Sequence, residues 1–495
     1  MRRSSGRRTG RLQHAVSPSA GGPVGDTPVR YPLRQLRADL LGIQRRLAAE
    51  NGGFARYQVL RRMFTLVASA EASRHMLVTQ PRNYPRGRQY DNLALLIGRG
   101  LITVDGTDWR RQRKLIQPVF DKALLTRVAE ITAAFTTELV DRWDQARQRN
   151  EQVDLLDDTQ ELAMRVIGMA LFSRDMRGDV PAGRTGPTVA AADCFTEAVR
   201  SGLSVAFLRN ISPVPVPLWL PTRLHRRFRA ALAAVDDYVY KRVDERLADP
   251  VGYRDILADL VRAYGDAALR SRRELRDQAV TLFFAGFETT AIAMAWTWLL
   301  LSENPGAEDR LHKELDQVLG GRAVPTAADL KALSVALQVV QESMRIYPPV
   351  YTLTRTAAAD DEVCGHQLAQ GDNIVIPVHA LQQMEQYWEQ PAAFCPERFA
   401  PGRLTDDQRL TYMPFSYGER RCLGASFATT EIVTMLAVAG QRVRLRRAGQ
   451  CPVAVVPAVT QRPADGTKMR VEARSVAAQP TEAPVVEAPV VEAPV

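Results

Sequence analysis

The sequence predicts a mainly α-helical fold with small β-sheets, built as one large domain. Long stretches repeat their apolar residues with the period of an amphipathic helix, whereas strand-like runs are few and short. No domain-scale linker divides the chain between its two polar ends. Of its 495 residues, 46% are hydrophobic and 24% are charged, which is typical of a globular protein. This composition excludes a wholly disordered chain, a collagen and a disulfide scaffold.

The expected helices are bounded by residues that stop helices. Pro305 separates two long helical patterns, and Pro348 with Pro349 ends a later one. Proline is too frequent in residues 212–221 for a helix, so a loop is expected there. The helical patterns cover residues 124–149, 222–248, 274–303, 306–319 and 329–346, and the strand-like runs are 351–356, 373–378 and 452–460.

The two ends of the chain differ in composition from the rest. Residues 1–30 carry six arginines and one acidic residue, so residues 1–27 are expected to form a disordered basic arm. The arm superficially resembles an organelle transit peptide, but it lacks the apolar stretch of a secretory signal. It contains no recognition module, so no nucleic-acid partner is expected. Repeated EAPVV predicts a disordered tail over residues 473–495, which leaves one domain over residues 28–472.

The most apolar stretch, residues 279–301, is long enough to span a bilayer. It carries Glu288 at its centre, with Thr289 and Thr290 beside it. An ionised carboxylate at the middle of a bilayer costs about 2–3 kcal/mol even on lenient scales. We therefore expect a buried core helix and no transmembrane anchor.

Five cysteines are scattered along the chain, and none forms a CxxC pair. An odd, sparse set is typical of a reducing compartment, which favours a cytoplasmic protein. Four of them are expected to be buried and inert. Cys422 differs, because Gly418 and Gly424 allow tight turns around it, and Arg420 and Arg421 add positive charge near the start of a helix. These neighbours predict a lowered pKa and a thiolate at Cys422.

The segment around this cysteine resembles the haem-binding loop of the cytochrome P450 family. Every fixed position of the family pattern FxxGxRxCxG is matched, by Phe415, Gly418, Arg420, Cys422 and Gly424. The resemblance extends over about residues 30–472. It implies the cytochrome P450 fold, with haem between a long central helix and the helix that follows the cysteine loop. It also implies that Cys422 is the thiolate ligand of the iron in haem b (iron protoporphyrin IX).

Other motifs of the family follow in the family's order. Glu342 and Arg345 match ExxR, in which positions i and i+3 place both charges on one helix face. Arg398 lies in residues 388–399, a segment that resembles the family's meander. The resemblance therefore implies a Glu342–Arg345–Arg398 network that holds the core near the haem. Where many members have His-Arg-Asp-Pro, residues 382–385 are Gln-Gln-Met-Glu. We expect that difference to affect local surface contacts and not haem binding.

Residues 285–290 resemble the family's oxygen-activating helix, (A/G)GxxTT with an acid. Gly286 is expected to allow a local distortion of this helix. The resemblance implies that Thr289 hydrogen-bonds the dioxygen substrate and that Glu288 relays protons to it. A Glu288 that is merely tolerated is a poor alternative, because burying an unpaired charge is costly.

Four residues are expected to hold the haem propionates, again from the resemblance. Trp109 and Arg113 match WxxxR, an i, i+4 pair on one helix face. Arg355 follows the double proline, where the family places another propionate-binding arginine, and Arg420 lies in the cysteine loop. A surface arginine is the alternative for Arg355, whose context is a single residue.

The resemblance implies a haem-thiolate monooxygenase that inserts one atom of O2 into a lipophilic small molecule of terpenoid, fatty acyl or polyketide type, as in secondary metabolism. Too few residues follow Cys422 for a fused reductase. Electrons are therefore expected from NAD(P)H through a separate ferredoxin or flavodoxin with its reductase, and the chain is expected to be a monomer. Two alternatives are a haem-binding sensor or carrier without oxygenase activity, which needs no proton relay, and a peroxide-driven haem-thiolate enzyme.

The candidate substrate-pocket residues are apolar or aromatic, which predicts the lipophilic substrate. Core packing is the alternative for every one of them. They are Leu93, Leu96, Ile97, Phe283, Phe284, Phe287, Val350, Tyr351 and Leu353.

A basic patch is expected on the cysteine side of the haem. Arg110, Arg111 and Lys114 are predicted to be free for solvent, with Arg421 next to them. Such a patch suits an acidic ferredoxin or flavodoxin, and its attraction for that partner weakens as salt rises.

Overall fold

A computed structural model describes residues 28–87, 89–177, 191–211, 216–267, 271–449, 453–457, 459–464 and 467–474. The arm predicted at residues 1–27 and most of the predicted tail lie outside the described residues. Ala473 and Arg474 lie inside them. Ala473 ends the last strand, and the Arg474 guanidinium pairs with Asp316 at 2.5 Å. The described residues therefore include the first two residues of the predicted tail.

Helices dominate the described residues, and this confirms the mainly α prediction. The α-helices are α1 Leu33–Glu50, α2 Ala70–Arg74, α3 Gln89–Ile97, α4 Gly106–Ile116, α5 Lys122–Gln148, α6 Leu155–Phe172, α7 Ala191–Ile211, α8 Arg223–Ala248, α9 Ile256–Tyr264, α10 Arg272–Glu303, α11 Pro305–Leu319, α12 Ala327–Ala332, α13 Ser334–Ile346, α14 Val378–Leu381, α15 Asp406–Thr411 and α16 Ala425–Ala439. The strands are β1 Val29–Tyr31, β2 Phe54–Val59, β3 Arg62–Val67, β4 Gln152–Asp154, β5 Leu353–Thr356, β6 Asp361–Val363, β7 His366–Leu368, β8 Asn373–Ile376, β9 Val443–Arg447, β10 Val455–Pro457, β11 Gln461–Pro463 and β12 Lys468–Ala473.

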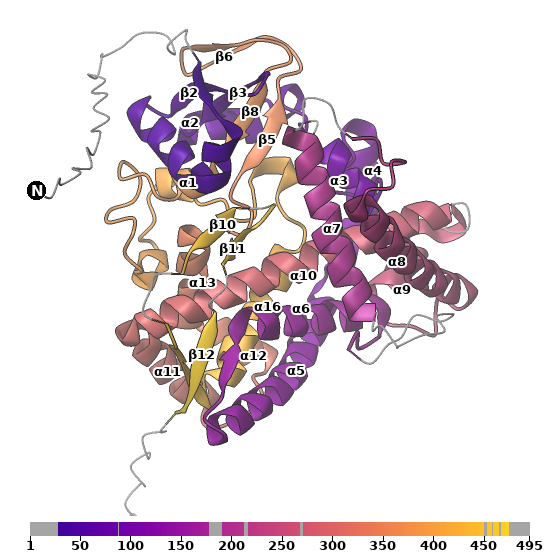
Figure 1. Ribbon diagram of the computed structural model, residues 1–495. Helices are drawn as coiled ribbons and strands as arrows, with labels where there is room; N and C mark the ends of the chain where they lie inside the picture. Colours follow the sequence, from indigo (N-terminus) through magenta and orange to yellow (C-terminus); the bar gives the residue numbers. More distant parts are fainter. Residues whose placement is uncertain are drawn as a thin grey trace, which may run out of the picture.

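Helix α10 runs through the middle of the molecule, with other helices packed along it (Figure 1). Its neighbours include α6, α8, α13 and α16. By length and composition α10 could cross a membrane, but most of its apolar stretch is buried inside the protein. The expected core helix is therefore confirmed, and many of the other helices pack on it.

The largest sheet lies above α10 in the view of Figure 1 and has the strand order β1-β2-β3-β8-β5. Strands β2 and β3 form an antiparallel hairpin, whereas β3 and β8 run parallel. Strand β5 closes the sheet and pairs with β8, with Arg355 opposite Ile374. A bridge between Arg86 and Arg355 attaches the segment before α3 to this edge. The sheet edge thereby brings two arginines from distant parts of the chain together.

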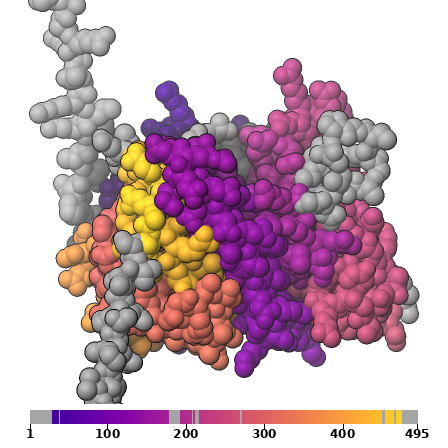
Figure 2. Space-filling model, turned by 90° about the horizontal axis from the view of Figure 1, so that it is seen from below, coloured from indigo at the N-terminus to yellow at the C-terminus, as the bar shows by residue number. Residues whose placement is uncertain are grey.

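Three small sheets complete the fold. Strands β4, β12 and β9 form one of them, and β12 packs against α5. In Figure 2 the C-terminal residues, drawn in yellow, lie directly beside the purple residues of the first third of the chain. The hairpin of β10 and β11 lies next to α10, and β6 pairs with β7.

Four expected helices agree with the structure to within two residues at each end, namely α5, α8, α10 and α11. The helix expected over residues 329–346 is wrong as a single element, because it breaks at Leu333 into α12 and α13. The break is stabilised by Glu314 of α11, whose carboxylate accepts hydrogen bonds from Val335 N at 2.7 Å and Ala336 N at 2.9 Å. A carboxylate from a neighbouring helix thus caps α13, and local periodicity carries no sign of it.

Candidate active site

The cysteine loop, residues 415–424, is folded as a tight turn just before α16. Cys422 N donates to Phe415 O at 2.8 Å, which closes the loop. Gly418 has φ +69°, and a Cβ there would overlap the carbonyl oxygen of Leu77. Glycine is therefore required at residue 418 for both its conformation and its close contact. Gly424 directly precedes the first turn of α16.

Opposing influences act on the pKa of the Cys422 thiol. Burial raises it above its usual value, whereas a hydrogen bond from the Gly424 backbone and the charges of Arg113 and Arg421 act to lower it. The predicted lowering is wrong for the protein alone, because desolvation of a thiolate outweighs these favourable neighbours. A bound metal ion reverses this balance, since a coordinating thiol is deprotonated outright.

The Cys422 side chain is surrounded by protein and still has exposed surface. A group of this kind faces an internal space and not bulk solvent. Helix α10 also has free surface near its middle, where Leu282 and Phe284 are only partly buried, and so are Ala285, Gly286 and Thr289. The last three of these residues share one helix face, and α10 packs on α16. The two elements that the resemblance assigns to either side of a haem both retain free surface.

Within the described residues, no group of three or more His, Cys, Asp or Glu side chains could hold a metal ion. Cys422 therefore offers a single protein ligand. A single thiolate matches a metal whose other ligands come from a macrocycle.

A cavity of about 320 Å³ opens between the cysteine loop, α4 and the edge of the large sheet. Arg86, Arg355 and Arg420 project into it from three different segments. Arg420 stacks over the Trp109 ring, with its guanidinium carbon 4.0 Å from the ring centroid. The lining residues are Met76, Leu77, Pro81, Arg82, Tyr84, Pro85, Arg86, Asp105, Gly106, Trp109, Arg110, Arg355, Glu419 and Arg420.

The cavity concentrates positive charge in a partly buried place. Burial, together with like-charge repulsion from Arg86 and Arg355, lowers the pKa of Arg420 to about 10. Burial also lowers the pKa of Arg355, which is 5% exposed. Asp105 accepts hydrogen bonds from Arg420 and from the Arg86 backbone, so one carboxylate partly neutralises this group. The residues fit a ligand that brings further carboxylates, as haem does with its two propionates.

The expected propionate residues do not all lie in this cavity. Trp109, Arg355 and Arg420 line it. Arg113 instead donates to the carbonyl of Arg421 at 3.1 Å and lies within electrostatic reach of Cys422. Arg113 therefore stabilises the backbone of the cysteine loop. It is not among the residues that line the cavity.

Glu288 and Thr289 of α10, the carboxyl and hydroxyl groups expected to deliver protons, each have a hydrogen-bond partner. Thr289 Oγ1 donates to Ala285 O at 2.6 Å, which leaves its lone pairs free to accept a hydrogen bond. Glu288 is buried, and its Oε1 accepts a hydrogen bond from Thr460 Oγ1 at 2.8 Å. Burial raises the pKa of Glu288, although the hydrogen bond from Thr460 and the charge of Arg462 act in the other direction.

Gly286 has a different role from the expected one. Helix α10 is continuous from Arg272 to Glu303. A Cβ on Gly286 would lie 3.0 Å from Ile167 Cδ1 of α6, which is tighter than ordinary van der Waals contact. Gly286 therefore allows α6 to approach α10 closely.

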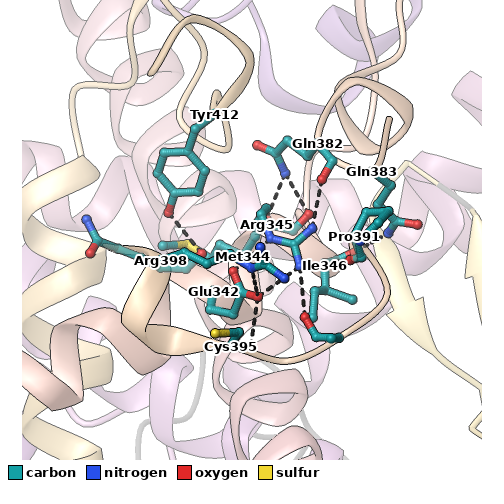
Figure 3. A network of polar contacts seen from close by, with 12 residues as sticks. Glu342, Met344, Arg345, Ile346, Gln382, Gln383, Pro391, Cys395, Arg398 and Tyr412 are labelled. Atoms are coloured by element: carbon teal, nitrogen blue, oxygen red, sulfur yellow. Dashed lines mark hydrogen bonds and ion pairs between the residues drawn. The ribbon is translucent and has the colours of Figure 1, made fainter. Parts of the chain in front are cut away.

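The Glu342–Arg345–Arg398 network is formed, with Glu342 and Arg345 fully buried and Arg398 at its partly buried edge (Figure 3). Arg345 Nε donates to Glu342 Oε2 at 2.7 Å, and Arg398 Nε donates to Glu342 Oε1 at 3.3 Å. Arg345 also donates to the carbonyls of Gln382 at 2.9 Å and Pro391 at 2.8 Å. The three charges thus tie α13 to the meander that leads into the cysteine loop.

The expectation that residues 382–385 affect only surface contacts is wrong for Gln382. Its side chain is fully buried, and its Nε2 donates to the carbonyls of Met344 at 3.0 Å and Arg345 at 2.9 Å (Figure 3). Its Oε1 accepts from Met413 N at 2.9 Å. Gln382 therefore belongs to the core network, in the place where many family members have histidine.

The candidate substrate-pocket residues separate into two groups. Phe283 and Phe287 are 1% and 2% exposed and belong to an aromatic cluster with Phe172 and Phe195, so they pack in the core. Leu96, Ile97, Tyr351 and Leu353 are buried as well, and their part in a substrate pocket stays a prediction. Those that retain free surface are Leu93, Phe284 and Val350.

Arg111 is exposed, as expected, but its charge is paired. Its guanidinium donates to both carboxylate oxygens of Glu274, at 2.8 and 2.9 Å, and its side chain is 49% exposed. Arg110, Lys114 and Arg421 are exposed.

Sequence reasoning missed three residues of the site. Arg86 and Asp105 belong to the arginine-lined cavity, and Thr460 holds Glu288. A signal existed only for Asp105, because an Asp just before Gly106 is a helix N-cap immediately upstream of Trp109. Arg86 and Thr460 meet their partners through the tertiary fold alone.

Comparison with known proteins agrees with this geometry. The family model Cytochrome P450 matches residues 23–451. Cyclooctatin synthase from Streptomyces melanosporofaciens is 35% identical over 354 residues, which cover 71% of this chain and 74% of that protein. Cyclooctat-9-en-7-ol 5-monooxygenase from the same organism is 31% identical over 383 residues, with 77% and 80% covered.

The fold is shared with a solved structure as well. The haem domain of a cytochrome P450DA mutant has a TM-score of 0.75 at 22% identity, covering 89% of this chain and 94% of that one. The cysteine loop, the charged network behind it and the family match agree with one another. The chain belongs to the cytochrome P450 family and is a haem-thiolate monooxygenase.

Proposed function

We propose that Cys422 ligates the iron of a haem b bound between α10 and α16, and that the enzyme inserts one atom of O2 into a lipophilic, terpenoid-like small molecule. The observation that carries the proposal is the cysteine loop, whose thiol faces an internal space next to an arginine-lined cavity. When bound, the haem supplies the iron at which dioxygen is activated. The side chains of this chain bind the haem, exclude water and deliver protons.

Arg355 and Arg420 would hold the propionates, with Trp109 as a platform under Arg420. Both guanidinium groups are mostly buried, so their charge repulsion is relieved when carboxylates enter. Charge-assisted hydrogen bonds between arginine and carboxylate fix both position and orientation. Such pairing would fix the orientation of the bound haem.

Thr289 and Glu288 would deliver protons to the dioxygen substrate. Cleavage of the O–O bond consumes two protons at the distal oxygen, so a hydroxyl and an acid suit the task. The Thr289 hydroxyl has a free acceptor site on the partly open face of α10, and the burial of Glu288 moves its pKa toward neutral pH. An acid whose pKa lies near the working pH exchanges protons efficiently.

The substrate class rests on two kinds of support. Leu93, Phe284 and Val350 are the candidate pocket residues with free surface, and all are apolar or aromatic. The relative cyclooctat-9-en-7-ol 5-monooxygenase is named for oxidation of an unsaturated cyclic alcohol. Together they favour a carbocyclic terpenoid over a fatty acyl or polyketide substrate.

The proposal is tested by screening cyclic terpene hydrocarbons and alcohols, fatty acids and polyketides against the purified ferric holoenzyme. A substrate that displaces water from the iron shifts the spin state, which is visible in the absorption spectrum. Hits are then turned over under 18O2 with surrogate redox partners, and one labelled oxygen atom is expected in the product. Reduced, substrate-saturated enzyme that forms no oxidised product would contradict the monooxygenase and favour a sensor or carrier. Turnover supported by peroxide alone would favour a peroxide-driven enzyme.

Electrons are proposed to enter through a basic patch made of Arg110, Lys114 and Arg421, which suits an acidic ferredoxin or flavodoxin. Electrostatic steering raises the association rate and is screened by salt, because the Debye length is about 10 Å at 0.1 M and about 3 Å at 1 M. Arg110→Glu with Lys114→Glu should slow reduction by the partner at low salt. Arg226→Glu, an exposed charge on α8, is the matched control. A salt-insensitive reduction rate that also ignores the double variant would place docking elsewhere.

A further inference from the structure

The carboxylate of Glu288 is held from outside its own helix. Thr460 lies between β10 and β11, 172 residues away in sequence, and its hydroxyl donates to Glu288 Oε1 at 2.8 Å. Both side chains are buried, at 6% and 4% exposed for Glu288 and Thr460. The other carboxylate oxygen, Oε2, has no hydrogen-bond partner among the described residues. One oxygen is therefore fixed by a neighbouring element, and the other keeps its acceptor site unused.

The hairpin that carries Thr460 is anchored firmly next to α10. Trp296 Nε1 donates to Gln461 O at 3.0 Å, two helical turns beyond Glu288 on the same helix. Gln461 N donates to Pro349 O at 2.9 Å, which ties the hairpin to the segment after α13. The Trp296 ring in turn stacks on Tyr347 with a centroid separation of 3.8 Å. Thr460 is therefore held by backbone and ring contacts that do not depend on its own hydroxyl.

We propose that Thr460 is a positioning residue of proton delivery, which fixes the Glu288 carboxylate through Oε1 so that Oε2 passes protons toward Thr289. This role rests on the proposed function of Glu288 and Thr289. It adds a residue of the C-terminal hairpin to a relay that the helix motif confines to α10.

The hydroxyl has two physical consequences for the carboxyl group. A donor to Oε1 selects one rotamer of a side chain that otherwise has no hydrogen-bond partner in the described residues. It also favours the ionised form, and so opposes the rise in the Glu288 pKa that burial causes. Arg462 of β11 is the charged group within electrostatic reach of Glu288, and it acts in the same direction. Loss of the hydroxyl leaves burial as the dominant influence.

The first test is spectroscopic and needs no turnover. In infrared difference spectra of the holoenzyme, the protonated-carboxyl band that disappears in Glu288→Gln reports the titration of Glu288. Thr460→Val should move this titration upward by about one to two pH units, since the lost hydrogen bond served the charged form. Thr460→Ser, which keeps the hydroxyl, should titrate as the wild type does.

The chain offers a matched control for the valine variant. Thr467 is also buried in the C-terminal segment, and its hydroxyl donates to the Asp154 carboxylate at 2.7 Å, away from α10. Thr467→Val removes a threonine–carboxylate hydrogen bond of the same kind. It should leave both the Glu288 titration and the coupling of electron use to product unchanged.

The second test is a double-mutant cycle in turnover. Thr460→Val should lower kcat about tenfold at neutral pH, which corresponds to one pKa unit, with KM unchanged and the acidic limb of the pH profile moved to higher pH. In the Glu288→Gln background the same substitution should have no further effect. Thr460→Ser should restore the rate.

Two results would overturn the assignment. One is a Glu288 titration in Thr460→Val identical to that of the wild type. The other is an equal loss of kcat from Thr460→Val in the wild-type and Glu288→Gln backgrounds, which would mean that the hydroxyl only supports the hairpin. Failure of the proposed function is distinguishable, because a wild-type protein that binds no thiolate-ligated haem fails in its own spectrum before any threonine is changed.

Discussion

At the scale of single residues, Thr289 and Glu288 are neighbours on α10 with different environments. Thr289 lies on the partly open face and donates only within its helix, whereas Glu288 is buried and bonded to the C-terminal hairpin. A hydroxyl with free lone pairs can accept a hydrogen bond from a protonated substrate oxygen, and a buried acid can resupply protons. Thr289 would therefore bind the substrate oxygen, and Glu288 would supply the protons.

This division predicts two distinct phenotypes. Thr289→Ala should consume reducing equivalents at nearly the normal rate but release them as hydrogen peroxide in place of product. Glu288→Gln should slow consumption about 10²–10⁴-fold, because an amide cannot cycle a proton. Cofactor oxidation, peroxide and product measured together distinguish the two. Tight coupling in Thr289→Ala would assign the role to another hydroxyl or to ordered water.

Single residues were predictable from sequence where a motif fixes their neighbours. The spacing of Glu342 and Arg345 places both on one helix face, and the structure joins them to Arg398. The pKa direction of Cys422 was not predictable in the same way, because it depends on burial. Burial is a property of the whole fold and overrides the charges that stand next to the cysteine in sequence.

At the scale of elements, the junction of α13 with the meander depends on Gln382 as much as on the charged network. One buried side chain satisfies two carbonyls at the end of α13 and the N–H of Met413 (Figure 3). Many family members have histidine at this position, and from the sequence the change to glutamine was expected to affect only surface contacts. The long-range partners of Gln382 make it a core residue.

Gln382→Leu should therefore destabilise the protein strongly. Each buried backbone group left unpaired costs about 1–3 kcal/mol, so the free energy of unfolding should fall by about 2–5 kcal/mol. Gln383→Leu is the control, since that partly exposed side chain donates to a single carbonyl, of Ile346 at 2.8 Å, and should cost about 1 kcal/mol or less. Urea unfolding of the holoprotein measures both. Equal midpoints for the two variants would contradict the core role.

Elements were predicted well where helical periodicity is long and uninterrupted, as in α5, α8, α10 and α11. Prediction failed where a distant side chain decides the outcome. Glu314 caps α13 from α11, so the run of apolar residues over 329–346 divides at Leu333. The aromatic packing of Phe283 and Phe287 was not predictable for the same reason, because their cluster includes Phe172 of α6 and Phe195 of α7, which no local pattern reveals.

At the scale of the whole molecule, two buried histidines link stability to pH. Burial lowers the pKa of His379 to about 4, and burial with nearby arginines lowers the pKa of His312 to about 3. His379 joins α14 to α1, with Nε2 3.0 Å from Leu41 O, whereas His312 lies in α11. Each is neutral when folded and binds a proton near pH 6.5 when unfolded.

The unfolded state consequently binds more protons below pH 6.5, and stability should fall as pH drops from 6.5 toward 4. Each histidine contributes a slope of up to about 1.4 kcal/mol per pH unit in that window. His379→Gln should reduce the slope of the free energy of unfolding against pH, whatever its effect on stability at pH 7. Unfolding of the holoprotein measured at several pH values tests this. An unchanged slope would mean that His379 is already protonated in the folded protein.

The proposed haem binding and the proposed oxygen chemistry both require Cys422 as the thiolate ligand of the haem iron. The most direct measurement is the absorption spectrum of the reduced carbon monoxide complex of the holoenzyme, compared with that of Cys422→Ser. The wild type should show the red-shifted Soret band of thiolate ligation, and the serine variant should lose it. An unshifted band in well-folded wild-type protein, or a shifted band that survives in Cys422→Ser, would contradict the account.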